Sequence, residues 1–158
     1  MRKSKISISG FKIGTAENRE GLTGVTVILA PDGGATAGVD VRGCAPGTRE
    51  TDLLDPRKTV QKIHAVVLSG GSAFGLEAAS GCVKYLAEQG VGFPIGNVCV
   101  PIVCSAVLFD LMIGDEKAYP DLLMGYEAAK SASSEFLSGC NGAGTLSLIH
   151  ISEPTRHS

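Results

Sequence analysis

HAVVLSGGSAFGLEAASGCVKYLAEQG, residues 64–90, changes its hydrophobic pattern near the middle. After the histidine, residues 65–68 are an unbroken apolar run, which is typical of a short strand covered on both faces. From residue 73 to Gly90 the apolar side chains recur with the period of an amphipathic helix. The stretch therefore predicts a buried strand, a tight turn and then a helix.

Ser69-Gly70-Gly71-Ser72 forms the junction between the predicted strand and helix. Paired glycines permit backbone angles that other residues resist, and Ser72 is placed to cap the helix. Unpaired N–H groups are therefore expected to converge there, where they could hold an anion or a developing oxyanion. A purely structural strand-to-helix turn is the alternative explanation of the two glycines.

Known glycine motifs match this junction poorly. The phosphate-binding pattern G-x-x-x-x-G-K-[ST] is absent because no lysine follows Gly75, and the dinucleotide pattern G-x-G-x-x-G fails on spacing. The esterase elbow G-x-S-x-G comes closest, although Phe74 replaces its last glycine. A serine hydrolase with Ser72 as nucleophile stays an alternative. Its only candidate base, His64, would lie roughly 25 Å away at ~3.3 Å per strand residue.

The composition is typical of one packed domain and indicates no special class of partner. Hydrophobic residues make up 44% of the 158 residues, and a chain of this length buries roughly two thirds of its unfolded surface. The 14 basic and 16 acidic residues nearly cancel, so no nucleic-acid footprint and no basic membrane-binding patch is expected. The apolar runs are too short to span a bilayer.

The cysteines include no C-x-x-C pair. They are Cys44, Cys82, Cys99, Cys104 and Cys140. No apolar signal sequence follows Met1, so a cytoplasmic location with reduced thiols is expected. Each thiol is predicted to be a small buried hydrophobe. Only His64 lies outside the last nine residues, so neither a zinc site nor any other metal or cofactor is expected.

The N-terminal third is predicted to be β structure. Residues 5–9, 24–30 and 37–42 alternate between apolar and polar side chains, and residues 31–34, PDGG, read as a hairpin loop between the last two strands. Residues 17–21 are polar and typical of a turn.

Residues 43–60, GCAPGTRETDLLDPRKTV, form a long connection. Loops of this length in compact domains are usually functional. Residues 48–52 could form an N-capped helical turn, and Arg49 could hold a carboxylate of a substrate. A solvated loop whose local ion pairs contribute little is the alternative.

The segments after the central helix predict further strands and a second helix. Residues 90–96 are rich in turn formers, and residues 98–111, VCVPIVCSAVLFDL, are expected to form one strand interrupted at Pro101 or two short strands. The latter segment ends in Phe109-Asp110, and the ends of strands are where sites collect. Residues 121–134 have helical periodicity.

The tail LSLIHISEPTRHS, residues 146–158, has no periodic pattern. It resembles the translated read-through of a sequencing adapter, so residues 1–145 are expected to be the natural part of the chain and the tail an artefact. A genuine short C-terminal strand is the alternative.

Four motifs, taken together and in this order, indicate a family. They are GCAPGTRETDLLDP (43–56), VVLSGGSAFGLEAASGCVKYL (66–86), VPIVCSAVLFDL (100–111) and YPDLLMGYEAAKSA (119–132). With them the chain resembles the L-aminopeptidase/D-esterase family, which includes β-aminopeptidases and nylon-oligomer hydrolases. The resemblance implies an α/β (α+β) fold, part of a four-layer α/β/β/α sandwich shared with ornithine acetyltransferase.

The resemblance also implies a mechanism. Family members are precursors that cleave themselves, and the new N-terminal Ser or Thr of the smaller subunit is the nucleophile. Its α-amino group, with a pKa of about 8, can act as general base, so no histidine is needed. The resemblance places this nucleophile beyond the sequence given. Residues 1–145 are then the N-terminal part of the larger subunit, inactive alone.

The expected substrate is a small peptide or amide. The expected partners are the missing C-terminal subunit and further copies in a homo-oligomer, with no nucleic acid and no membrane. The alternative to any enzyme is a non-catalytic incomplete domain, whose unpaired sheet edge would promote aggregation.

The resemblance carries over a pocket wall to this chain. Relatives have a Tyr directly before an Asp, where this sequence has Phe109 followed by Asp110. Phe cannot donate a hydrogen bond, so oxyanion stabilisation is left to backbone N–H groups or to a side chain of the missing part. The turn Gly70-Gly71-Ser72 is implied to lie beside the pocket, with Phe74 packed under it. Core packing is the alternative role for both phenylalanines.

Overall fold

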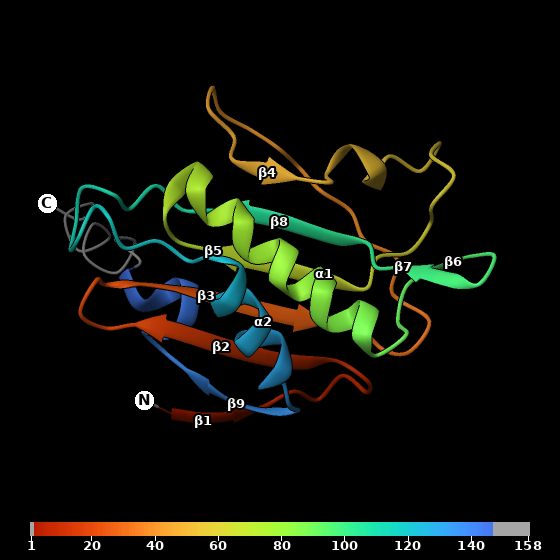
Figure 1. Cartoon of the computed structure of the whole chain (residues 1–158), viewed down its shortest axis with the longest axis horizontal. Coiled ribbons are helices and arrows are strands. Elements are labelled where there is room, and N and C mark those ends of the chain that lie inside the picture. The colour runs from red at the N-terminus through yellow and green to blue at the C-terminus, as the bar shows by residue number, and fades with distance from the viewer. Residues whose placement is uncertain (1, 147–158) are drawn as a thin grey trace, which may run out of the picture.

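The computed structural model describes residues 2–146, which build three layers around a central sheet (Figure 1). The five strands of that sheet are arranged in the order β2-β3-β5-β8-β4. Their bounds are Lys12–Asn18 (β2), Thr23–Leu29 (β3), Ala65–Ser69 (β5), Val103–Val107 (β8) and Thr48–Arg49 (β4). Strands β5 and β8 are parallel, and the other neighbours are antiparallel.

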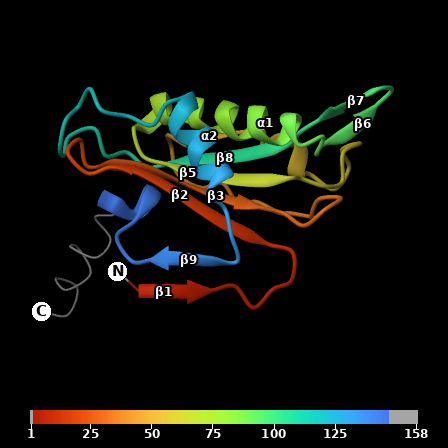
Figure 2. The same cartoon turned by 60° about the horizontal axis from the view of Figure 1, so that its bottom comes forward.

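Two helices cover one face of this sheet (Figure 2). They are α1 (Ala78–Glu88) and α2 (Leu122–Lys130). Beneath them the alternating side chains of the central strands are fully buried, as at Val25, Val27 and Val67. Because successive strand residues point to opposite faces, these positions form one continuous apolar surface for the helices.

The two helices touch backbone to backbone through glycines. A β-carbon added at Gly81 would lie 1.9 Å from the carbonyl oxygen of Leu122, and one added at Gly125 would lie 1.9 Å from that of Ala78. Real side chains do not fit at such distances, so the close approach of α1 and α2 depends on both glycines.

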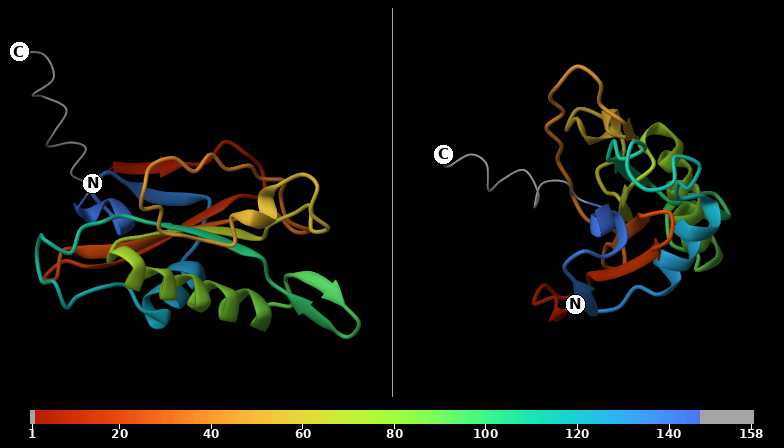
Figure 3. Two further views of the ribbon diagram at one scale, coloured as in Figure 1. Left: turned by 90° about the horizontal axis from the view of Figure 1, so that it is seen from above. Right: turned by 90° about the vertical axis from the view of Figure 1, so that its left-hand side faces the viewer.

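The other face of the sheet carries the beginning of a further layer. Strands β1 (Arg2–Lys5) and β9 (Glu135–Ser138) pair antiparallel, and the 3₁₀ helix η3 (Gly142–Leu146) packs on β3. Figure 3 shows β1 and β9 on the side of the main sheet opposite to the helices. This small layer leaves Leu68, in the central strand β5, 38% exposed. The order helix, sheet, sheet agrees with the predicted α/β/β/α arrangement.

A hairpin extends from one end of the molecule (Figure 1). Its strands β6 (Phe93–Ile95) and β7 (Val98–Val100) pair antiparallel, and all of their side chains are exposed. The segment 98–111 thus contains two short strands, β7 and β8, on either side of Pro101. This confirms the second of the two predicted forms.

The predictions for the N-terminal third are right only in part. Strand β3 confirms the strand at 24–30, whereas residues 37–42 form no strand. Val39 and Val41 alternate in sequence, but both are exposed and no strand within residues 2–146 pairs with them, because the chain here crosses from β3 to β5. The first strand ends at Lys5 instead of covering 5–9. Of the turn predicted at 17–21, residues 19–21 do form a turn, whereas Glu17 and Asn18 belong to β2.

The connection 43–60 is long, as predicted, but its local structure differs. Residues 48–49 form the edge strand β4, and the only helical turn is the 3₁₀ helix η1 (Asp52–Leu54), which has no side-chain cap. Strand β8 offers a free edge there, and pairing with it overrides the local capping pattern.

The predicted second helix is α2. It begins after Asp121, whose Oδ1 accepts the backbone N–H of Met124 at 2.8 Å, and it ends at Lys130, before the predicted residue 134. None of the helices within residues 2–146 is long and apolar enough to cross a membrane.

The prediction that each cysteine is buried is right for two of the five and wrong for three. Cys82 and Cys104 are buried, whereas Cys44, Cys99 and Cys140 are exposed. Burial raises the pKa of Cys82 to about 12. Burial and, secondarily, the charge of Glu50 raise the pKa of Cys104. Both buried thiols are therefore protonated and unreactive at neutral pH.

Candidate functional site

The turn 69–72 lies where the parallel strands β5 and β8 both end. Gly71 has a φ of 78° and precedes the 3₁₀ helix η2 (Ser72–Glu77), which continues into α1. The predicted strand, turn and helix are thus confirmed. Sites in open α/β sheets collect at the carboxyl ends of parallel strands, so the position of the turn fits a functional role.

The N–H groups of this turn are not free. That of Gly70 donates to the carbonyl of Gly24 at 2.9 Å, that of Gly71 to Asp110 Oδ1 at 2.6 Å, and that of Ser72 to the carbonyl of Leu108 at 2.9 Å. The expectation of unpaired N–H groups at residues 70–72 is therefore wrong. Acceptors distant in the sequence satisfy these donors, as buried backbone groups require.

Ser72 does not cap the helix. The capping position is Gly71, and no side chain there accepts a helix N–H. Ser72 itself has a φ of 52°, a left-handed conformation that costs a non-glycine residue energy. The turn is thus held in a strained form by its surroundings.

Asp110 supplies much of that constraint. It is 7% exposed, and its Oδ1 receives the Gly71 N–H. A β-carbon at Gly70 would lie 2.3 Å from Asp110 Oδ2 and 2.6 Å from Thr23 Oγ1, so only glycine fits. The buried Thr23 hydroxyl has no hydrogen-bond partner among the described residues. Asp110, Thr23 and the two glycines thus form one tight cluster.

Aromatic side chains surround the turn. Phe74 is 58% exposed and stacks on Tyr119, with ring centroids 4.9 Å apart and planes 20° apart. Phe109 is 70% exposed. Neither phenylalanine is core, and Phe74 lies outside the turn instead of being packed under it. Stacking on Tyr119 holds the Phe74 ring at the surface.

Sequence reasoning missed Tyr119 and Thr23 as parts of the site. Tyr119 lies against the turn, since a β-carbon at Gly71 would come within 2.5 Å of its Cβ. Its position directly before Pro120-Asp121 reads only as the start of a helix. Thr23 has no signal in the sequence, because its role depends on contacts with Gly70.

The Arg49 side chain makes its hydrogen bond outside this cluster. Its Nη1 donates to Ser80 Oγ in the first turn of α1 at 2.7 Å. The guanidinium thus links the edge strand β4 to helix α1, which is a structural role.

His64 lies at the other end of β5 from Ser72. Its backbone N–H donates to the Ile102 carbonyl at 2.8 Å, and its Nδ1 accepts the Ile102 N–H at 3.1 Å. Burial lowers the pKa of its imidazole. The structure therefore does not bring His64 and Ser72 together as a base and a nucleophile.

We expect the free energy of unfolding to fall as the pH is lowered from about 7 toward about 5. An unfolded imidazole binds a proton near its ordinary pKa of about 6.5, whereas folded His64, with its lowered pKa, binds it only at lower pH. The unfolded state therefore holds more protons in this window. As the pH falls through this window, the free energy of unfolding therefore decreases by up to about 1.4 kcal/mol per pH unit.

Urea denaturation across this window measures the slope. His64→Asn keeps an oxygen that can accept the Ile102 N–H but does not titrate, so its slope should be flatter than that of the parent chain. Equal slopes would contradict the assignment to His64.

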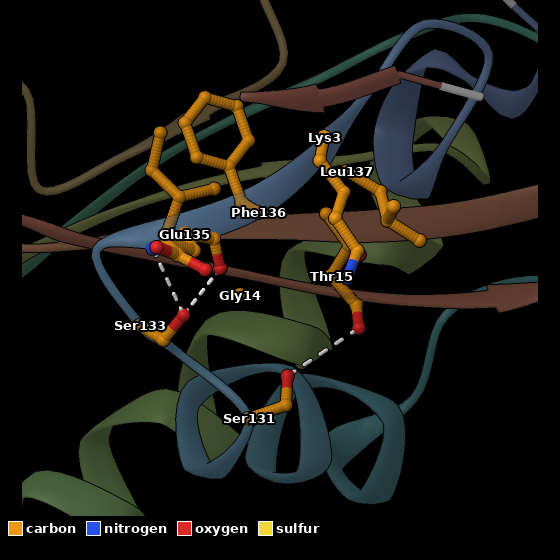
Figure 4. Close-up of a pocket in the computed structure, with 9 residues that line it drawn as sticks. Lys3, Gly14, Thr15, Ser131, Ser133, Glu135, Phe136 and Leu137 are labelled. Carbon is orange, nitrogen blue, oxygen red and sulfur yellow. Dashed lines mark hydrogen bonds between the residues drawn. The ribbon is translucent and has the colours of Figure 1, made fainter. Parts of the chain in front are cut away.

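A cleft of about 400 Å³ lies elsewhere, between β2, the end of α2 and β9 (Figure 4). Lys3 and Glu135 are among the residues that line it. Ser133 Oγ is hydrogen-bonded to the backbone of Glu135, and Ser131 Oγ donates to the carbonyls of Ala128 and Thr15. Both hydroxyls are engaged with backbone groups. The cleft is large, but it carries none of the expected site residues.

Comparison with known proteins identifies a family and several relatives of this chain. Peptidase family S58 matches residues 6–151. The chain is 47% identical over 121 residues to an uncharacterized aminopeptidase of Mycobacterium tuberculosis, covering 77% of this chain and 35% of that protein. It is 36% identical over 141 residues to the 6-aminohexanoate-oligomer endohydrolase of Kocuria sp., covering 89% of this chain and 37% of the relative. The chain thus spans about a third of the length of these relatives.

Solved structures share the fold. The PH0078 protein of Pyrococcus horikoshii superposes with a TM-score of 0.69 at 22% identity, over 87% of this chain and 43% of that one. A β-aminopeptidase of Burkholderia sp. gives 0.62 at 19%, over 87% and 41%. Ornithine acetyltransferase of Mycobacterium tuberculosis gives 0.50 at 16%, over 84% and 76%. By its sequence match over nearly the whole chain, this protein belongs to peptidase family S58.

Proposed function

We propose that the protein to which this chain belongs is an aminopeptidase or amidohydrolase that cleaves an amide or ester next to a free amine. Its nucleophile is an N-terminal Ser or Thr that self-cleavage exposes. Membership of peptidase family S58 and the similarity to proteins named aminopeptidase and 6-aminohexanoate-oligomer endohydrolase support this proposal. The terminal amine, with a pKa of about 8, serves as the general base.

The observation that carries the proposal is that the backbone N–H groups of the turn already have hydrogen-bond acceptors within the chain. The N–H groups of residues 70–72 all donate to acceptors within the chain, and within residues 2–146 no histidine lies beside Ser72, because His64 is at the other end of β5. Residues 2–146 therefore offer a shaped surface without a complete catalytic set. The length of the relatives, about three times the matched segment, leaves room for the nucleophile on another segment.

In this proposal the described residues form one wall of the substrate pocket. The turn 70–72, fixed by Asp110, is the rigid part, and the exposed rings of Phe74, Tyr119 and Phe109 are the apolar part. Phe109 offers no hydroxyl, so an oxyanion is stabilised by groups of the remaining part of the protein.

The remaining part of the protein is also the proposed partner. It covers the half-exposed face of the central sheet, where Leu68 is unprotected, and extends the two-stranded layer β1-β9. Two strands with unpaired edges form only a marginal layer by themselves. We further propose a cytoplasmic homo-oligomer that needs no cofactor.

For the chain itself we propose that it is inactive, as an incomplete domain. The alternative, an esterase elbow at Ser72, would need a base that His64 does not supply. Expression of residues 1–158 should give no turnover of L-alanine p-nitroanilide or of p-nitrophenyl acetate above the level of denatured protein. Turnover that Ser72→Ala abolishes would contradict the proposal and favour the elbow.

A further inference from the structure

A second cleft, of about 370 Å³, opens at the end of β5 opposite to the turn. Its lining residues come from the loop after β3, the segment before β5 and the base of the β6–β7 hairpin. The residues that give it chemical character are Lys62, His64, Phe93 and Pro94. None of them takes part in the proposed hydrolytic site.

His64 presents a fixed hydrogen-bond donor to this cleft. The side chain is 95% buried, since only 5% of the residue is exposed. Because Nδ1 accepts the Ile102 N–H, the neutral ring carries its proton on Nε2. The edge that bears Nε2 is opposite to Ile102, and no described residue accepts its hydrogen. A β-carbon at Gly34 would lie 3.5 Å from Nε2, so the glycine loop packs beside the ring without binding it.

The charge around this donor is positive. Lys62 lines the same cleft, and its ammonium group has no hydrogen-bond or ion-pair partner within residues 2–146. A β-carbon added at Gly34 would lie 3.1 Å from Lys62 Cβ and 3.5 Å from His64 Nε2, which places the two side chains next to each other. No residue that lines the cleft carries a carboxylate. An anion would thus meet one unpartnered N–H, one cation and no repelling charge.

The opposite wall is apolar and rigid. Phe93 is half-exposed into the cleft and is followed by Pro94. The hairpin base is tight, since a β-carbon at Gly92 would lie 2.5 Å from the carbonyl carbon of Val100. An aromatic ring and a proline held in place favour a flat apolar body of the ligand.

We propose that this cleft is a binding site for small organic carboxylates with a planar apolar body. The carboxylate accepts the Nε2–H of His64 and lies near the Lys62 ammonium, and the apolar body packs on Phe93. The site is separate from the proposed hydrolytic site, and its existence does not depend on that function.

Nuclear magnetic resonance on the nitrogen-15-labelled 158-residue chain tests the proposal with benzoate as the probe. At about pH 7.5, where His64 is neutral, benzoate should shift the His64 ring signals saturably, with a Kd of about 1 mM. Benzamide has the same shape without the charge and should bind at least about tenfold more weakly. Equal binding of both would overturn the proposal.

Variants locate the probe. His64→Asn keeps the acceptor for Ile102 but loses the Nε2 donor, and should weaken benzoate binding at least about tenfold. His64→Gln can place an amide N–H near the former Nε2 and should retain binding. Lys62→Gln should weaken it about threefold, whereas Lys58→Gln, the same charge change outside the cleft, should have no effect. Unchanged binding by a folded His64→Asn chain, checked by its dispersed amide spectrum, would refute the site.

Discussion

Gly125→Ala is expected to lower the free energy of unfolding by at least about 3 kcal/mol. The added β-carbon would lie 1.9 Å from the carbonyl oxygen of Ala78 and 2.9 Å from its Cα. These are backbone atoms, so no side chain can rotate away to make room. Helix α2 has to shift off α1, which opens the tight packing of Ala78, Ala128 and Ala129.

Urea denaturation followed by circular dichroism measures this change. Gly38→Ala is the matched control, because a β-carbon there meets no atom within 4 Å, and its stability should stay within about 0.5 kcal/mol of the parent chain. A Gly125→Ala chain as stable as this control would show that the two helices do not pack as described.

Asp110→Ala is expected to cost about 2–3 kcal/mol, because it removes a charged acceptor from the buried Gly71 N–H. The amide of Gly71 should then exchange its hydrogen at least about tenfold faster. Asp110→Asn is the matched control. Its amide oxygen can accept the same N–H, and its NH₂ can reach the unpartnered Thr23 hydroxyl beside Gly70.

The two variants separate the hydrogen bond from the charge. Asp110→Asn should keep most of the stability and the slow exchange at Gly71. An unchanged exchange rate in Asp110→Ala would mean that Asp110 does not fix the turn. In that case the rigid part of the proposed pocket wall would have no support.

The strand, turn and helix of residues 64–90 could be predicted because their signals are local. A continuous apolar run, two glycines and a helical period follow one another, and each is visible within a few residues. The strand expected at 37–42 has an equally clear alternation but fails. Alternation indicates only which side chains would share a face of a strand. A strand also needs a neighbouring strand to pair with. Here β3 pairs with β5 instead.

Which residues meet at the turn could be predicted from the sequence, whereas their contacts could not. Gly70, Gly71, Ser72 and Asp110 do come together, with Phe74 and Phe109 around them. The partners of the turn N–H groups could not be read from the sequence, because Asp110 is 39 residues away from Gly71. Free donors at the turn were expected because local reasoning sees a helix N-terminus and not the acceptors that the fold brings to it.

Intact-mass analysis of the purified product of the uninterrupted gene, alongside a denaturing gel, tests the self-processing mechanism itself. We expect two polypeptides whose masses add up to that of the translated precursor, the smaller one beginning with Ser or Thr. A single uncleaved polypeptide that still hydrolyses an amide substrate would contradict the proposed N-terminal nucleophile. A single inactive polypeptide that ends in SEPTRHS would contradict the proposed hydrolase function, while leaving the family membership intact.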